Sequence, residues 1–362
     1  MLFREVNMLT IDDTHHLPAQ DSAASQVTFQ FLDGVERQIQ VSPGQTILDA
    51  AKSNDIRLVH QCKTGSCGTC VAKVLCGDVR MSTERGTSLF PSEHAEGLRL
   101  TCSSFADTDC VLGLDYASTL LDEPAPALVQ SVVTGKEWVA PNVVKLTLAL
   151  PCDVDFEFRS GQYVRIRVPG TDAWRSYSMA SSTHDLPAVT LLLRVLDEGM
   201  MSNYLRKSCA VGDELELEGP YGTFYWRPSK AAHILIAGGT GLAPMLAMLD
   251  DISVLSGKKP KVLLSFGCAT ADNLFCLDEL DVRAALLPNL ALRVSVSSPD
   301  GTYGGLVGNP VSVIAAEDIV DPETVAYLCG PPAMIESARR HLEDIGVKRD
   351  NIHAEQFSAS AE

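Results

Sequence analysis

The sequence predicts a multidomain protein of the α+β and α/β classes, and three observations lead to this fold class. First, 362 residues are enough for two or three domains, each with its own core. Second, the middle of the chain contains short runs of alternating apolar and polar residues separated by turns, a pattern typical of an antiparallel β-barrel. Third, the last part alternates longer apolar strands with helical stretches, which indicates a doubly wound parallel sheet.

The charge balance and the cysteine usage narrow the classes of function. The 46 acidic and 29 basic residues give a formal net charge of −17, which argues against nucleic-acid binding and favours solubility or a basic partner surface. Several cysteines, such as Cys268 and Cys276, lie in ordinary apolar segments, so we expect reduced thiols and a cytoplasmic protein. Residues 231–249 lack charge, but their glycines and proline indicate a strand, a turn and a helix and no membrane span.

The first part of the chain has the signals of a small domain that mixes strands with a helix. Residues 1–24 show no sustained period, and we expect a flexible extension there. Next come two alternating runs around an Asp-Gly turn, which predict a β-hairpin, and then a capped helix. Further strands are expected over 71–75 and 98–102, so we place this domain at residues 25–120.

The most informative stretch is a cysteine-rich loop within this domain. Cys62, Cys67 and Cys70 have a C-x4-C-x2-C spacing, and Cys102 follows further along the chain. This is the plant-type spacing of thiolates that hold a two-iron, two-sulfur cluster, and glycines inside the loop let the backbone curl. A structural zinc site would need a second short cysteine or histidine knuckle, which does not follow. Buried cysteines acting as small hydrophobes are the other alternative, but three within one polar loop favour a cluster.

A stiff polar segment at residues 120–128 contains two prolines and is expected to link this domain to the next. Alternating runs over 144–150, 163–168 and 213–218 then predict an antiparallel barrel, which we place at residues 125–228. Each run sets apolar side chains on one face and charged or polar side chains on the other, as barrel strands require.

Two motifs in the barrel segment are suited to a phosphate-bearing ligand. Arg175-Ser-Tyr-Ser178 places a guanidinium, an aromatic ring and a hydroxyl on one extended run, where alternate side chains share a face. The segment from Gly199 to Leu205 is typical of a loop that opens a short helix, whose free N–H groups suit a phosphate. Each motif alone also fits an ordinary strand or an ordinary capped helix.

The third domain is expected over residues 229–362. It begins with a buried strand at 233–237, a tight glycine turn at 238–241 and an apolar helix, and a later strand ends in a Cys-Gly-Pro-Pro turn at 329–332. Ligands of parallel sheets bind beyond the carboxyl ends of the strands, where both turns lie. The glycine turn does not match G-x-G-x-x-G, and Cys329 alone also fits a buried thiol at a strand end.

These motifs carry a family resemblance along nearly the whole chain. Residues 26–118, with their spaced cysteines, resemble a plant-type ferredoxin domain of the β-grasp fold. The resemblance implies that the four thiolates of a 2Fe-2S cluster come from Cys62, Cys67, Cys70 and Cys102. The part after the linker resembles the flavin and NAD domains of the ferredoxin-NADP reductase superfamily, which implies a barrel that binds FAD and a parallel-sheet domain that binds NADH.

The superfamily resemblance also assigns roles to single residues. It implies that Arg175 and the helix after the loop meet the FAD pyrophosphate, and that Tyr177 meets the ribityl chain and the flavin ring. Ser178, Cys329 and Phe357 are expected at the site of hydride transfer, with the Phe357 ring over the flavin face that nicotinamide must reach. The complete set implied for FAD and NADH binding is Arg175, Ser176, Tyr177, Ser178, Arg194, Gly199, Met201, Ser202, Gly238, Gly239, Thr240, Gly241, Cys329, Gly330, Pro331 and Phe357.

The order of the three modules resembles the reductase component of a bacterial multicomponent oxygenase. That resemblance implies a monomeric oxidoreductase that passes electrons from NADH to FAD, to the 2Fe-2S cluster and on to a terminal oxygenase, either a Rieske ring-hydroxylating dioxygenase or a di-iron hydroxylase. NADH is favoured over NADPH because residues 265–273 offer only neutral groups and Asp272 where a 2′-phosphate would need Arg or Lys. The face around residues 65–69 is expected to dock the partner.

Two alternatives share these motifs. A reductase of the same architecture could serve another acceptor, as a deoxysugar reductase would. The chain could also be a redox-sensing regulatory binding protein that keeps the cofactors without an oxygenase. Turnover with NADH and an artificial acceptor would argue against the regulatory alternative.

Overall fold

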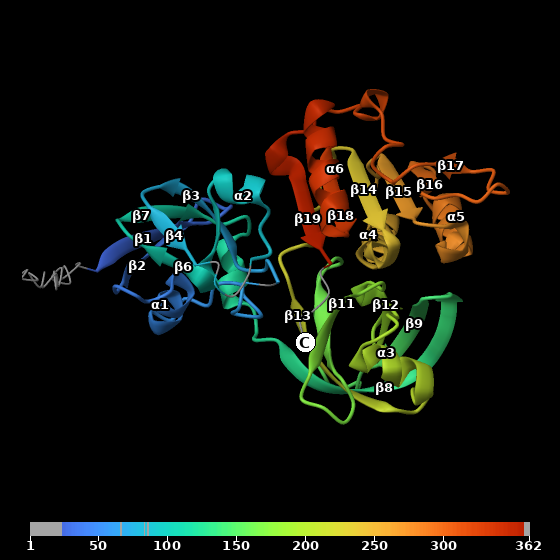
Figure 1. The fold of residues 1–362 in the computed structure, drawn as a ribbon, viewed down its shortest axis with the longest axis horizontal. Helices are drawn as coiled ribbons and strands as arrows, with labels where there is room; N and C mark the ends of the chain where they lie inside the picture. The colour runs from blue at the N-terminus through green and yellow to red at the C-terminus, as the bar shows by residue number, and fades with distance from the viewer. Residues whose placement is uncertain (1–23, 66, 83, 85–86, 358–362) are drawn as a thin grey trace, which may run out of the picture.

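The computed structural model describes residues 24–65, 67–82, 84 and 87–357. Figure 1 shows three bodies, the N-terminal one at the left and the other two stacked at the right. The flexible extension expected over residues 1–24 lies outside the described residues except for its last residue. The predicted fold class is confirmed, because the three bodies are built on a mixed sheet, an antiparallel sheet and a parallel sheet.

The N-terminal body is a five-stranded mixed sheet in the order β2-β1-β7-β3-β5, with a separate β4-β6 pair. Thr46 caps α1, because its Oγ1 accepts a hydrogen bond from the N–H of Asp49 at 3.1 Å. Phe29, Ile47 and Leu112 are fully buried and join the sheet to α1. The elements are β1 (Ser25–Gln30), β2 (Glu36–Val41), α1 (Ile47–Ser53), β3 (Val71–Cys76), β4 (Val79–Met81), α2 (Pro91–Ala95), β5 (Leu98–Leu100), η1 (Thr101–Ser103), β6 (Ser104–Ala106) and β7 (Cys110–Gly113).

Six antiparallel strands in the order β11-β10-β13-β8-β9-β12 form the second body. An antiparallel bridge between Met179 and Leu191 joins the two outer strands and closes the sheet into the predicted barrel. Alternate side chains, among them Leu146, Ile166 and Leu217, fill the barrel interior. The elements are β8 (Ala127–Ala140), β9 (Val143–Ala149), β10 (Tyr163–Arg167), β11 (Trp174–Ser178), β12 (Ala188–Arg194), α3 (Met200–Lys207) and β13 (Glu214–Tyr221).

The third body has a parallel sheet in the order β17-β16-β15-β14-β18-β19, covered by helices on both faces. Leu235 and Phe266 pack on the side of α4 and α5, and Ile234 and Leu263 pack on the side of α6, which is the predicted doubly wound arrangement. None of the helices in the described part of the chain has the length and apolarity to cross a membrane. The elements are β14 (His233–Gly238), α4 (Leu242–Val254), β15 (Val262–Cys268), α5 (Leu277–Leu286), β16 (Leu290–Val296), β17 (Leu306–Val307), β18 (Val325–Gly330), α6 (Pro332–Asp344) and β19 (Ile352–Gln356).

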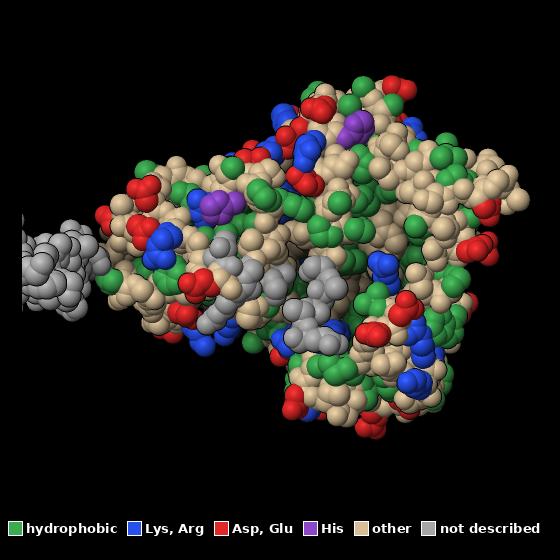
Figure 2. All heavy atoms as spheres, in the orientation of Figure 1, with side chains coloured by type: hydrophobic (Ala, Val, Ile, Leu, Met, Phe, Trp, Pro, Cys, Tyr) green, Lys and Arg blue, Asp and Glu red, His purple; other side chains and the backbone are tan. Residues whose placement is uncertain are grey.

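Ion pairs join the N-terminal body to the parallel-sheet body. The buried carboxylate of Glu93 in α2 lies 2.8 Å from the guanidinium of Arg339 in α6. Glu96 and Arg349 form a second pair across the same contact. Figure 2 shows acidic and basic side chains interspersed along the upper edge of this junction. These pairs dock the N-terminal body, so its cysteine loop faces the other two bodies.

Candidate functional site

The four predicted cluster thiols come together in two pairs. Cys67 interacts with Cys62, and that interaction together with burial raises the pKa of Cys67. Cys70 interacts with Cys102, which raises the pKa of Cys70 and lowers the pKa of Cys102. No compact group of three metal-binding side chains occurs among the described residues. Two pairs of thiols suit a cluster with two irons, because each iron takes two protein thiolates. The residues therefore fit a 2Fe-2S cluster.

The loop that carries these thiols is turned towards the barrel. Gly65 is buried, and the Thr69 hydroxyl lies 3.2 Å from the hydroxyl of Tyr163 in β10. Gly65 is therefore not accessible to a partner, whereas Thr69 is half-buried, and the expected docking face around residues 65–69 stays a prediction. The exposed part of the loop is one turn earlier, around Lys63.

The predicted flavin motif occupies most of strand β11. The Arg175 guanidinium donates to the carbonyl oxygen of Trp174 at 3.0 Å. Tyr177 packs against the barrel core, and burial raises its pKa. The Ser176 hydroxyl points the other way and accepts a hydrogen bond from Nε2 of Gln61 at 3.0 Å. The motif thus has one face on the barrel and one contact with the cysteine loop.

The three residues predicted for hydride transfer meet around a carboxylate that the sequence did not single out. The Ser178 hydroxyl donates to Glu355 Oε2 at 2.8 Å, and Glu355 pairs in register with Cys329 across β19 and β18. Phe357 follows two residues later, and its N–H donates to the carbonyl oxygen of Gly330 at 3.0 Å. Glu355 lies two residues before the predicted Phe357, but only its long-range contact with Ser178 shows its place.

Burial sets the protonation of the acidic groups at this meeting point. It raises the pKa of Glu355 to about 7, against the opposing effect of the hydrogen bond from Ser178. Burial also raises the pKa of Cys329 well above its ordinary value. Cys329 therefore stays a neutral thiol at neutral pH. A neutral thiol fits both a residue at the site of hydride transfer and a buried thiol at a strand end. Glu355 keeps some accessible surface because it lines a cavity of about 150 Å³ at the junction of the three bodies.

The two predicted nucleotide turns lie against one another, with no room for a side chain at Gly238, Gly241 or Gly330. A Cβ on Gly241 would lie 2.1 Å from the carbonyl oxygen of Cys329, and a Cβ on Gly330 would lie 3.2 Å from the Cα of Gly238. Gly239 has a φ of 54° and faces open space. The turns therefore form a bare backbone surface at the carboxyl ends of β14 and β18, the edge at which parallel sheets commonly bind ligands. Thr240 and the exposed Pro331 belong to the same two turns.

The remaining predicted residues lie at the end of β12 and the start of α3. Helix α3 begins at Gly199 without a side-chain cap, so its first N–H groups suit a phosphate. Met201 and Ser202 are buried in its first turn, and Ser202 Oγ accepts from the N–H of Leu196 at 3.0 Å. Arg194 ends β12 close to the thiol of Cys268, at the carboxyl end of β15. The structure thus brings the predicted flavin and nucleotide residues to facing edges of the two bodies.

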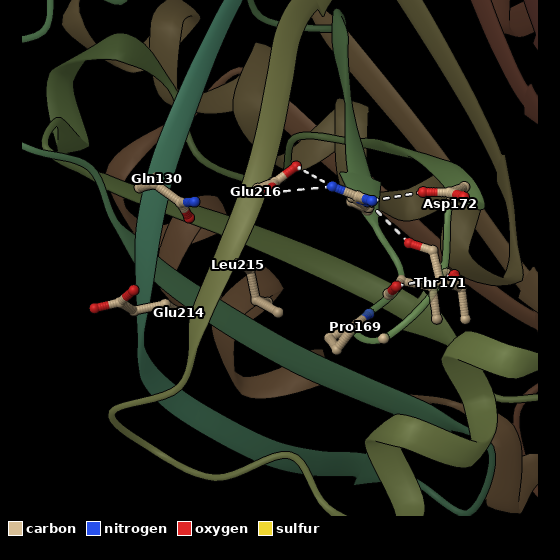
Figure 3. Close-up of a pocket in the computed structure, with 10 residues that line it drawn as sticks. Gln130, Pro169, Thr171, Asp172, Glu214, Leu215 and Glu216 are labelled. Carbon is tan, nitrogen blue, oxygen red and sulfur yellow. Dashed lines mark hydrogen bonds and ion pairs between the residues drawn. The ribbon is translucent and has the colours of Figure 1, made fainter.

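A larger hollow of about 490 Å³ lies on the outside of the barrel and is shown in Figure 3. Glu216 and Asp172 point to the Arg167 guanidinium, with contacts of 3.2 Å and 2.6 Å. Arg167 lies at the opposite end of the β10-β11 pair from Ser178. Because these charged groups satisfy one another away from the predicted site, we assign no ligand to this hollow.

Comparison with protein families defines the class of protein. The descriptions that match are a 2Fe-2S iron-sulfur cluster binding domain at residues 30–107, an oxidoreductase FAD-binding domain at 130–226 and an oxidoreductase NAD-binding domain at 235–340. Together with the thiol pairs and the facing nucleotide turns, they define an iron–sulfur flavoprotein oxidoreductase that uses a 2Fe-2S cluster, FAD and NAD.

Individual relatives narrow the class. The chain is 34% identical to the toluate 1,2-dioxygenase electron transfer component of Pseudomonas putida, over 93% of this chain and 99% of that protein. It is 32% identical to the propane 2-monooxygenase reductase component of Rhodococcus jostii, over 96% of this chain and 95% of that protein. A ferredoxin reductase in carbazole 1,9a-dioxygenase shares the fold, with a TM-score of 0.65 at 23% identity, covering 93% of this chain and 100% of that one. The chain belongs to the family of electron transfer components of multicomponent dioxygenases and monooxygenases.

Proposed function

We propose that this protein takes electrons in pairs from NADH and delivers them singly, in the cytoplasm, to the terminal oxygenase of an aromatic ring-hydroxylating dioxygenase or a di-iron monooxygenase. The observation that carries this proposal is a chain of contacts through the junction. Gln61 of the cysteine loop bonds Ser176, and Ser178 on the same strand bonds Glu355. Glu355 in turn is in register with Cys329 at the nucleotide turns. Relatives of both oxygenase kinds support the proposal.

In this proposal the protein mainly binds and orients the cofactors and NADH. When bound, FAD would supply the chemistry for hydride transfer from NADH, and the 2Fe-2S cluster would supply single-electron transfer. Arg175 and the N-terminus of α3 would hold the FAD pyrophosphate by charge and by backbone N–H groups, and Tyr177 would pack against the flavin. Ser178, Cys329 and Phe357 would surround the place where nicotinamide meets flavin, and the buried Ser178 and Cys329 would help to keep water out.

The proposal also includes NADH as the preferred nucleotide. The loop after β15, residues 269–273, carries Asp272 and no Arg or Lys. Arg206 lines the same surface hollow as Asp272, but its guanidinium donates to the carbonyl oxygens of Leu196 and Asp197 at 2.6 Å and 3.1 Å. A 2′-phosphate at this position would therefore meet a carboxylate rather than a free guanidinium.

Reconstitution tests both parts of the proposal. Purified holoenzyme is combined with NADH or NADPH and with the oxygenase component of either an aromatic dioxygenase or a di-iron monooxygenase, and substrate hydroxylation is measured. We expect hydroxylation with at least one oxygenase, and a preference for NADH in kcat/KM of more than about tenfold, or about 1.4 kcal/mol. Fast cytochrome c reduction without hydroxylation by either oxygenase would contradict the proposed partner. A preference for NADPH would contradict the proposed nucleotide.

The proposed working unit is a monomer with an iron–sulfur domain at residues 25–120, an FAD domain at 125–228 and an NAD domain at 229–362. Sedimentation equilibrium of the holoenzyme is expected to give the mass of one 39.0 kDa chain plus its cofactors. Limited proteolysis is expected to cut first in the linker at residues 120–128. A dimer mass, or a first cut inside one of the three domains, would contradict this organisation.

A further inference from the structure

One tyrosine hydroxyl contacts both halves of the cysteine loop. The Tyr163 hydroxyl donates to Oε1 of Gln61 at 2.7 Å, and it lies 3.2 Å from Oγ1 of Thr69. Since its single proton is used on Gln61, the hydroxyl of Thr69 is the donor in the second contact. Gln61 directly precedes Cys62, and Thr69 directly precedes Cys70. These two cysteines belong to different thiol pairs, so one hydroxyl bonds the side chain that directly precedes a cysteine of each pair.

The barrel holds this tyrosine rigidly. Tyr163 is 6% exposed, and its ring stacks on Tyr221 with centroids 5.7 Å apart and an interplanar angle of 19°. The backbone of Gly222 packs so closely that a Cβ there would lie 3.0 Å from the Tyr163 ring. A register irregularity between β10 and β13 begins at Tyr163, and such irregularities commonly redirect a side chain. The ring therefore has a fixed direction, set by strands and not by a loop.

The same tyrosine belongs to the flavin side of the junction. In the β10-β11 pair Tyr163 lies directly opposite Ser178. The Gln61 amide that accepts from Tyr163 also donates to the Ser176 hydroxyl on β11 at 3.0 Å. The cysteine loop is thus bonded to two neighbouring strands, one of which carries the predicted flavin motif. The arrangement is a small polar network in a nearly buried place, where such bonds fix geometry most strongly.

We propose that Tyr163 is a positioning residue that ties the cluster loop to the flavin-binding strand and thereby fixes the separation that single electrons must cross. This inference rests on the proposed function, because it assumes that electrons leave the flavin for the cluster. Tyr163 itself is neither oxidised nor reduced. Each electron that leaves the flavin is the one that the cluster gains, and the hydroxyl keeps its proton throughout.

Hydrogen exchange of the oxidised holoenzyme tests the tie without any electron transfer. Tyr163→Phe removes the hydroxyl and keeps the ring. The matched control is Tyr221→Phe, which removes a hydroxyl from the stacked ring that does not reach the loop. We expect backbone amides of residues 61–70 to exchange about fivefold faster in Tyr163→Phe, and at an unchanged rate in Tyr221→Phe. The factor of about five is the change that loss of one net hydrogen bond makes in the equilibrium of local opening.

Rapid mixing with NADH then gives the functional readout. Tyr163→Phe is expected to slow reduction of the iron–sulfur absorbance about fivefold while flavin bleaching keeps its rate. Unchanged exchange in Tyr163→Phe, or equal effects of the two tyrosine variants, would overturn the inference. Failure of the wild-type cluster to be reduced would instead contradict the proposed function, and the exchange result would still decide whether Tyr163 ties the loop.

Discussion

The carboxyl of Glu355 gives a prediction whose size follows from the structure. Burial raises its pKa from 4.5 to about 7. The folded protein therefore holds a proton that the unfolded chain has released between these pH values, so the free energy of unfolding falls as the pH rises through this window. At 1.36 kcal/mol per pKa unit, the full loss above pH 7 is about 3 kcal/mol. Glu355→Gln keeps an acceptor for Ser178 but cannot ionise.

The variant should therefore be more stable than the wild type at pH 8, by up to about 3 kcal/mol, and the difference should shrink towards pH 5. Urea unfolding of the holoenzyme, followed by the rise of flavin fluorescence on FAD release, measures the difference at both pH values. The control Glu323→Gln alters an exposed ion pair with Lys348 and should change stability by less than about 1 kcal/mol at either pH. A Glu355→Gln variant that is no more stable at pH 8, or equally stabilised at both pH values, would refute this account of Glu355.

Three further predictions concern the cluster, the junction and the nucleotide turns. Cys67→Ser should abolish the iron–sulfur absorbance and cytochrome c reduction but leave NADH-dependent flavin reduction largely intact, and an unchanged spectrum would refute the ligand assignment. Arg339→Met removes the ion-pair partner of the buried Glu93 carboxylate and should lower the free energy of unfolding in urea by about 3–5 kcal/mol, with recovery when Glu93→Met is added. Equal stability of the single and double variants would argue against the ion pair. Gly241→Ala places a methyl group against the Cys329 carbonyl oxygen, so it should lower the free energy of unfolding by about 1–3 kcal/mol and weaken NADH binding measured by titration. Wild-type stability and NADH affinity would show that the turns are loosely packed.

The parts of the site that repeat a local pattern could be predicted from the sequence. The spacing from Cys62 to Cys70 and the run Arg175–Ser178 place their groups within one loop or one strand, so residue type and spacing are enough. The glycine turn at 238–241 follows a strand, and its position beyond the carboxyl end of a parallel sheet follows from topology.

Contacts between the three bodies could not be predicted, because they have no local pattern in the sequence. Gln61 and Ser176 are 115 residues apart, and Ser178 and Glu355 are 177 residues apart. Neither pair has a periodic or spacing signal, because each depends on how two separately folded bodies dock. The same reason explains why the contact between Thr69 and Tyr163 could not be predicted, since these residues are 94 apart in the sequence and lie in different bodies.

We propose that electrons pass within this one chain from NADH through FAD to the cluster. Anaerobic rapid mixing of the oxidised holoenzyme with NADH tests it most directly, with flavin and iron–sulfur absorbance followed separately and the product frozen for electron paramagnetic resonance. We predict that flavin bleaching comes first, that iron–sulfur reduction follows, and that Cys67→Ser retains only the first phase. Flavin bleaching in the wild type with no later change in the iron–sulfur signal would contradict the claim.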